Sequence, residues 1–171
     1  MMWRVLLVCC LLSPLFSFAD DSYLLGAGDK IAIRVFGHTD LDLETQLTDS
    51  GTINYPFLGS IKVTGLTLKQ LETLIYNGLK GDYLVEPNIN VGIAEYRPFY
   101  IHGEVRKPGA FPYQPGLTVN QAIALAGGLT ERASRDRITL SREANKEVAE
   151  TATLASRVNA GDTIIISQRF F

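Results

Sequence analysis

The repeat of the apolar residues changes once in each half of the chain, from every two residues, as in a strand, to every 3.6 residues, as in a helix. This change restricts the fold more than any other feature. Ile31, Ile33 and Val35 alternate with polar or small neighbours, as in a strand with one buried face. Similar strand-like segments follow at residues 41–47, 52–56, 60–64 and 88–94. Between the last two segments the apolar residues instead form a helical stripe, made of Leu68, Leu71, Leu74, Ile75 and Leu79.

Both expected helices begin with the same signal. Residues 65–70 and 116–121 each place a threonine three positions before a glutamine, which is the capping-box pattern. The two segments agree at four of six positions, and we attribute this to shared capping requirements, with duplication as the alternative. Gly81 and Gly127-Gly128 predict the helix ends.

After Arg97-Pro98 the order of elements repeats in a shorter form. Lys107 to Ala110 predicts a type II turn with Pro108 and Gly109 at its centre. Strand-like segments surround the second helix, at residues 99–105, 111–113, 137–142 and 163–166. We therefore expect an α+β protein of two small β-rich modules, each wrapped around one helix, that meet near residue 97.

The first 19 residues have the composition of a secretory signal peptide. Arg4 precedes an apolar run that ends at Ala19, after which we expect cleavage. The run is shorter than the about 20 residues that a membrane-spanning helix needs, and an uncleaved anchor is the alternative. Cys9 and Cys10 lie inside the run without the small preceding residue of a lipidation site. We therefore expect no lipid anchor and a mature chain without thiols.

The sequence does not predict catalysis, a metal site or a cofactor. His38 and His102 have no metal ligands at suitable offsets, and no serine lies in a nucleophile-elbow motif. Gly28-Asp29 and Gly161-Asp162 each precede an expected strand, so we interpret both pairs as structural turns. Paired carboxylates leave a glycan-cleaving enzyme as a weaker alternative. The net charge of −2 and the lack of a long basic run argue against nucleic acid as a partner.

Aromatic residues gather around the expected junction of the modules. They are Tyr96, Phe99, Tyr100, Phe111 and Tyr113. Rings with polar tips suit contact with sugars or with another subunit. The alternative is that these residues form the core of a small β module. We retain them as candidate glycan or subunit contacts.

The ordered set of motifs resembles the polysaccharide biosynthesis/export family. Residues 23–37, with Gly28-Asp29 ahead of an alternating strand, are similar to the opening of the export domain, and residues 49–59 are similar to its continuation. Residues 100–109 and 161–164 look like the first and last parts of a soluble-ligand-binding β-grasp (SLBB) module. The resemblance implies a signal peptide at 1–19, an export domain at 20–97 and an SLBB β-grasp domain at 98–171.

The resemblance also implies a function. We expect a non-enzymatic periplasmic component of a capsule or exopolysaccharide export machine, associated with the outer membrane and assembled as a homo-oligomer. The implied partners are polysaccharide and an inner-membrane polysaccharide co-polymerase. Larger members build the outer-membrane pore from a C-terminal helix, whereas five residues follow Ile166 here, so we expect a separate pore or barrel protein. The alternative is a monomeric periplasmic protein that binds a glycan or small ligand.

Overall fold

The computed structural model describes residues 23–145 and 148–169. The predicted signal peptide, with its cleavage site at Ala19, lies outside the described residues. The strands are β1 (Lys30–Val35), β2 (Leu43–Gln46), β3 (Thr52–Tyr55), β4 (Gly59–Lys62), β5 (Ile89–Glu95), β6 (Phe99–Gly103), β7 (Gly109–Phe111), β8 (Ala133–Ser141), β9 (Ala149–Ala152) and β10 (Thr163–Gln168). The helices are α1 (Leu68–Leu79), α2 (Val119–Leu125) and two short 3-10 turns, η1 (Thr39–Leu41) and η2 (Glu143–Asn145).

In the N-terminal half, one helix and a small hairpin share a core with a three-stranded sheet. β1 lies at the centre of an antiparallel sheet of order β2-β1-β5, while β3 and β4 form a separate hairpin. The inward residues of these strands share a core with Leu71, Ile75 and Leu79, the apolar stripe of α1. Since helix and sheet each have one apolar face, neither face would be covered without the other.

The C-terminal half is built on one mixed sheet of order β7-β6-β10-β8-β9. The last strand, β10, lies between β6, to which it is parallel, and β8, to which it is antiparallel. Val119, Ala122 and Ile123 of α2 belong to the core that covers this sheet. The first and last strands of this half, β6 and β10, are therefore direct neighbours in the sheet.

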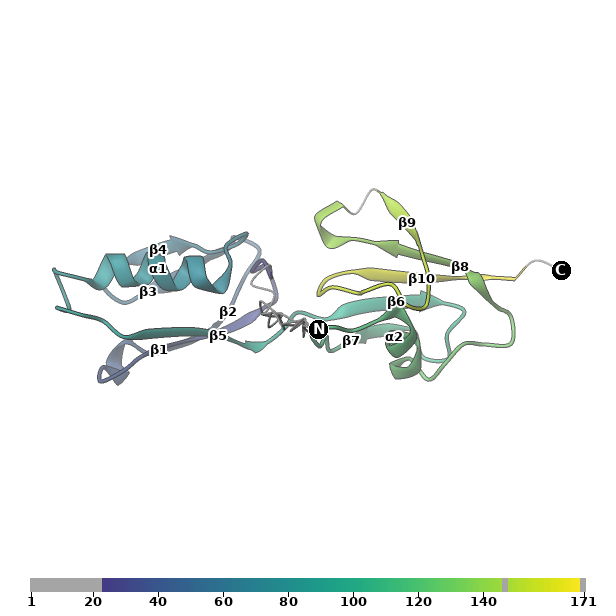
Figure 1. Ribbon diagram of the computed structural model, residues 1–171, viewed down its shortest axis with the longest axis horizontal. Coiled ribbons are helices and arrows are strands. Elements are labelled where there is room, and N and C mark those ends of the chain that lie inside the picture. The colour runs from purple at the N-terminus through teal and green to yellow at the C-terminus, as the bar shows by residue number, and fades with distance from the viewer. Residues whose placement is uncertain (1–22, 146–147, 170–171) are drawn as a thin grey trace, which may run out of the picture.

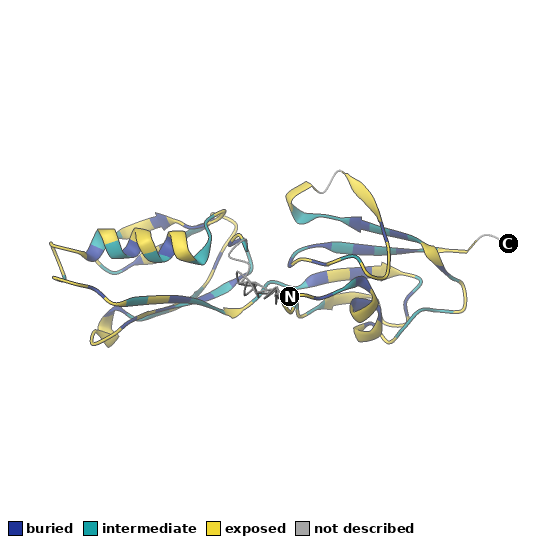
Figure 2. Cartoon of the chain, viewed as in Figure 1, coloured by how far each residue is buried: buried dark blue, intermediate teal, exposed yellow. Residues whose placement is uncertain are grey.

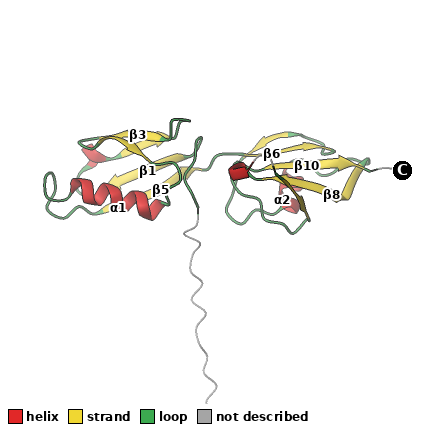
Figure 3. Cartoon of the chain, turned by 90° about the horizontal axis from the view of Figure 1, so that it is seen from above, coloured by secondary structure: helices red, strands yellow, loops and turns green. Residues whose placement is uncertain are grey.

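The two halves follow one another along the long axis of the molecule (Figure 1). Figure 3, seen at a right angle to that view, shows the same separation. Buried residues run through both halves in Figure 2, and they form two distinct clusters, one spanning Leu25 to Val91 and the other Phe99 to Ile166. The chain passes between the clusters at Tyr96-Arg97-Pro98.

The predicted α+β class and both predicted helices are confirmed. Thr67 and Thr118 each accept the backbone N–H of the glutamine three residues on, and each glutamine side chain accepts the threonine N–H in return. The expected strand over residues 41–47 is shorter, because Thr39–Leu41 forms a 3-10 turn before β2. Strand β9 was not predicted, since Ala149–Ala152 has no alternating apolar pattern.

The connection between β6 and β7 differs from the predicted type II turn. Gly109 has a φ of 156°, far from the value near 80° that the turn requires, and it is already the first residue of β7. The N–H groups of Arg106 and Lys107 donate to the carbonyls of Gly128 and Ala126 at the end of α2. These two bonds attach the start of the connection to the end of α2.

Candidate functional site at the junction of the two halves

The turn that precedes β1 contains a fully buried carboxylate. Asp29 is 0% exposed, and its Oδ2 accepts the backbone N–H of Gly26 at 2.9 Å. The N–H of Asp29 donates to the carbonyl of Gly26 at 3.2 Å, which closes the turn. Gly28 has a φ of 93°, a conformation that a side chain would strain. A buried carboxylate also needs a charged partner, because its desolvation costs several kcal/mol.

The turn that precedes β10 repeats this geometry in the other half. Asp162 is 2% exposed, and its Oδ2 accepts the N–H of Asn159 at 2.8 Å. The N–H of Asp162 donates to the carbonyl of Asn159, and Gly161 has a φ of 82°. Arg142 Nη1 lies 2.7 Å from Asp162 Oδ2 and supplies the positive charge.

Arg97 connects the first turn with the C-terminal half. Its Nη1 donates to Asp29 Oδ2 at 2.6 Å, and its backbone N–H donates to Asp29 Oδ1 at 2.9 Å. Its Nε donates to Glu143 Oε2 at 2.6 Å on η2. The Arg97 side chain is 13% exposed, so these contacts are shielded from water and hold charge pairs more strongly than a surface salt bridge does.

The second turn joins the same set of contacts. The N–H of Glu143 donates to Asp162 Oδ1 at 3.3 Å, and the N–H of Gly161 donates to the carbonyl of Pro98 at 3.0 Å. Both Gly-Asp turns therefore hold the segment that links the halves. We call this set the junction network, formed by Asp29, Arg97, Arg142, Glu143 and Asp162.

A row of tyrosines lies beside the junction network. The Tyr23 hydroxyl donates to Asp29 Oδ1 at 2.6 Å and accepts from Arg97 Nη1 at 2.8 Å. Its ring meets that of Tyr96 edge-on at 5.0 Å, and Tyr96 meets Tyr113 in the same way at 5.4 Å. The row passes from one half of the chain to the other and adds aromatic packing to the ionic contacts.

The Tyr23 hydroxyl is expected to stay protonated in strong base. Burial, and next the hydrogen bond to Asp29, raise the pKa of Tyr23 far above the ordinary value of about 10. A raised folded-state pKa means that the stabilisation is complete below about pH 10 and is lost as the pH rises further. The test is a pH titration of tyrosinate absorbance in the unaltered chain and in Tyr23→Phe. The variant should differ only at the highest pH, by a smaller absorbance change from the tyrosines that ionise last. Loss of amplitude near pH 10 would contradict this assignment.

The structure places the five aromatic candidates in three different environments. Phe99 is 0% exposed and stacks on Phe111 at 5.9 Å in the C-terminal core, so Phe99 has no surface to offer a ligand. Tyr96 and Tyr113 are half-buried in the tyrosine row. Tyr100 is 46% exposed on β6. Contact with glycan or subunit stays a prediction, and Tyr100 offers the most surface for it.

Sequence reasoning placed both Gly-Asp pairs correctly ahead of strands but missed their partners. Arg97 was interpreted only as part of the boundary between the modules, and Arg142 and Glu143 were not singled out. One signal was present: Gly26-Ala27-Gly28-Asp29 and Asn159-Ala160-Gly161-Asp162 share their last three residues. A repeated turn that buries a carboxylate implies a nearby cation.

Two further properties concern the described residues, 23–145 and 148–169. None of their helices is long and apolar enough to cross a membrane. They contain no group of three or more His, Cys, Asp or Glu side chains arranged to hold a metal ion. His38 and His102 are both exposed.

Two family models match the chain in succession. Residues 18–94 match the polysaccharide biosynthesis/export protein model, and residues 98–150 match the SLBB domain model. The gap between the two matches contains Tyr96 of the tyrosine row and Arg97 of the junction network.

Curated relatives match along most of the chain. The exopolysaccharide production protein ExoF of Rhizobium meliloti is 34% identical over 80% of this chain and 37% of its own length. The polysialic acid transport protein KpsD of Escherichia coli is 29% identical over 88% of this chain and 29% of its own length. The EPS I polysaccharide export outer membrane protein EpsA of Ralstonia nicotianae is 26% identical over 91% and 50%, respectively. The chain thus spans half or less of the length of these relatives.

Proposed function

Because the chain belongs to the polysaccharide biosynthesis/export family, we propose that it is a non-catalytic periplasmic component through which a capsule or exopolysaccharide reaches the outer membrane. The names of all three relatives concern production, transport or export of a polysaccharide, which supports this role. The proposed domains are an export domain at residues 20–97 and an SLBB domain at 98–171, after a cleaved signal peptide.

The junction network is the observation that carries the proposal. A component of a conduit must hold its surfaces at fixed positions while a flexible polymer passes. In this chain the linking segment is held by a largely buried arginine, Arg97, between two carboxylates, Asp29 and Glu143. Isolated domains joined by a flexible linker would not need such contacts. The network favours a rigid two-domain part over a pair of independent binding modules.

We propose that several copies assemble into a closed oligomer that acts with an inner-membrane polysaccharide co-polymerase and an outer-membrane pore. The alternative remains a monomeric periplasmic carrier of a glycan or small ligand. Light scattering during size-exclusion chromatography separates the two. A closed oligomer elutes at a multiple of the chain mass, and a carrier elutes at the mass of one chain.

Deletion of the gene is expected to abolish delivery of the polymer to the cell surface. Surface polysaccharide is measured by extraction and sugar analysis, alongside polymer retained inside the cell. Re-expression of the intact chain should restore surface polymer, while retained polymer should return to its original level. Normal surface polymer in the deletion strain, with no related gene expressed, would refute the proposed function.

A further inference from the structure

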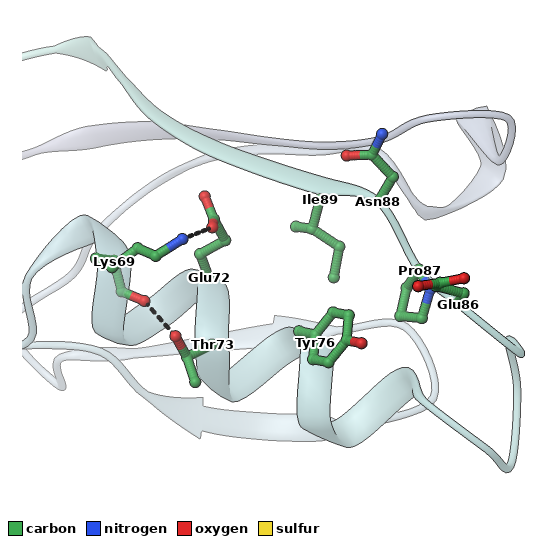
Figure 4. A pocket seen from close by; sticks show the side chains of 8 residues that line it. All are labelled: Lys69, Glu72, Thr73, Tyr76, Glu86, Pro87, Asn88 and Ile89. Atoms are coloured by element: carbon green, nitrogen blue, oxygen red, sulfur yellow. Dashed lines mark hydrogen bonds and ion pairs between the residues drawn. The ribbon is translucent and has the colours of Figure 1, made fainter.

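A groove of about 620 Å³ runs along the N-terminal half, outside the junction network (Figure 4). One wall is a face of α1 and the other is the segment that leads into β5. The volume lies within the range of about 300–1,000 Å³ typical of sites for small molecules. Its lining residues are Lys69, Glu72, Thr73, Tyr76, Glu86, Pro87, Asn88 and Ile89.

The groove exists because α1 has two different faces. Its buried stripe faces the core, whereas Lys69, Glu72, Thr73 and Tyr76 follow the spacing i, i+3, i+4, i+7 on another face. This face is internally ordered: the Thr73 hydroxyl donates to the Lys69 carbonyl at 2.8 Å. Lys80 Nζ donates to the Tyr76 hydroxyl oxygen at 2.8 Å and so steadies the phenol ring.

The lining combines an apolar floor with a rim of oxygen acceptors. Figure 4 shows Ile89 and Tyr76 pointing toward one another from opposite walls, with Pro87 beside them. The carboxylates of Glu72 and Glu86 stand at the rim. A sugar ring has the matching character, with C–H groups on its faces and hydroxyl donors at its edge. A wholly apolar ligand would displace water from the carboxylates without offering them hydrogen bonds.

The charged side chains at the groove indicate which class of sugar it can bind. Lys69 Nζ lies 2.5 Å from Glu72 Oε1, so the single lysine of the lining is paired with one of its two carboxylates. Lys80, whose ammonium contacts the Tyr76 hydroxyl, offsets the carboxylate of Glu86, so the four charges at the groove sum to zero. The groove therefore has no excess positive charge to attract a sugar that carries a carboxylate, and an uncharged sugar needs none.

The same loop that forms one wall carries a second exposed aromatic surface. Tyr83 stacks on Phe57 at 4.7 Å, and the two side chains are 48% and 61% exposed. Phe57 has a φ of 63°, the only positive φ among the described residues other than glycine. A bulky residue held in this conformation is strained by about 1–3 kcal/mol, and such residues gather at ligand-contacting sites. Two exposed contact surfaces on one half suit a polymer better than a single pocket does.

We propose that the groove binds an uncharged sugar residue of the exported polymer, with the sugar ring against Tyr76 and its hydroxyls donating to the glutamate carboxylates. This inference rests on the proposed function for the identity of the polymer. Binding at one sugar residue is weak, which allows a chain in transit to move on.

The test is an NMR titration of the full chain, purified from the periplasm, with cellohexaose and maltohexaose as uncharged probes and oligogalacturonate as the anionic probe. At least one uncharged probe should shift the amide signals of Glu72, Tyr76 and Ile89, and oligogalacturonate should bind more weakly. Tyr76→Leu should weaken binding about tenfold, equivalent to about 1.4 kcal/mol. Glu86→Gln, at an exposed position, should weaken it with no change in the fold.

Glu131→Gln is the matched control for Glu86→Gln, since Glu131 is an exposed glutamate of the other half. It should bind as the unaltered chain does. The groove proposal is overturned if no uncharged probe shifts the groove amides, if oligogalacturonate binds more tightly, or if Glu131→Gln weakens binding as much as Glu86→Gln does. The proposed function is judged separately by the deletion strain, so it can stand when the groove fails.

Discussion

Replacing Arg97 with methionine is expected to lower the free energy of unfolding by about 3–5 kcal/mol, as measured by urea denaturation. Methionine keeps much of the apolar length of the side chain but removes the charge that faces Asp29 and Glu143. The Asp29 carboxylate is 0% exposed and would be left in the interior without a cation. The two cores should then unfold in separate steps, because the contact that couples them is lost.

Arg34→Met is the matched control for this experiment. Arg34 also pairs with two carboxylates, Asp42 and Glu44, but its side chain is 51% exposed. Water screens that interaction, so the control should change stability by less than about 1 kcal/mol. Asp29→Asn combined with Arg97→Met should recover part of the loss, since the fully buried carboxylate is then gone and Glu143, at 30% exposed, remains in contact with water. Equal effects of Arg97→Met and Arg34→Met would contradict the assigned role of the junction network.

Gly103→Ala is expected to destabilise the C-terminal half by about 2–5 kcal/mol, the sum of backbone strain and a steric clash. Gly103 ends β6 with a φ of 90°. A Cβ there would lie 2.1 Å from the carbonyl oxygen of Ile166, which also accepts the N–H of Glu104. The clash is with backbone in the parallel pairing of β6 and β10, so no side-chain rotation relieves it.

Gly128→Ala separates the two contributions. Gly128 has the same φ of 90°, but a Cβ added there would meet no neighbouring atom within 4 Å, so this variant tests backbone strain alone. Its cost should be about 1–2 kcal/mol. Chemical denaturation followed by circular dichroism measures both variants. If Gly103→Ala costs no more than Gly128→Ala, the β6–β10 contact is looser than the structure indicates.

Local patterns predicted the elements whose stability is local. The capping boxes at Thr67 and Thr118 join residues only three positions apart, and both formed as expected. Strand β9 was missed because its residues carry no pattern of their own. It forms along the edge of β8, where backbone pairing replaces an apolar signal.

At the candidate site, too, only the features with local causes were predicted. The positions of Gly28-Asp29 and Gly161-Asp162 were readable, because a turn before a strand has local requirements for glycine and aspartate. Which aromatic residues are exposed could not be predicted from the sequence. Phe99 and Tyr100 are neighbours on a strand and face opposite sides, with 0% and 46% exposure. Only the tertiary structure shows that α2 packs in the core on the Phe99 side.

The amino-acid sequence by itself determined the two helices, the class of the fold, the Gly-Asp turns and the resemblance to an export family. These depend on periodicity, caps and ordered motifs, which act between residues close along the chain. Only the tertiary structure decided that Arg97 joins Asp29, 68 residues away, to Glu143, 46 residues away. Such a contact forms because a carboxylate that leaves water needs a cation beside it. Any cationic residue that the folded chain brings within reach can meet this need, so the sequence alone does not identify the partner.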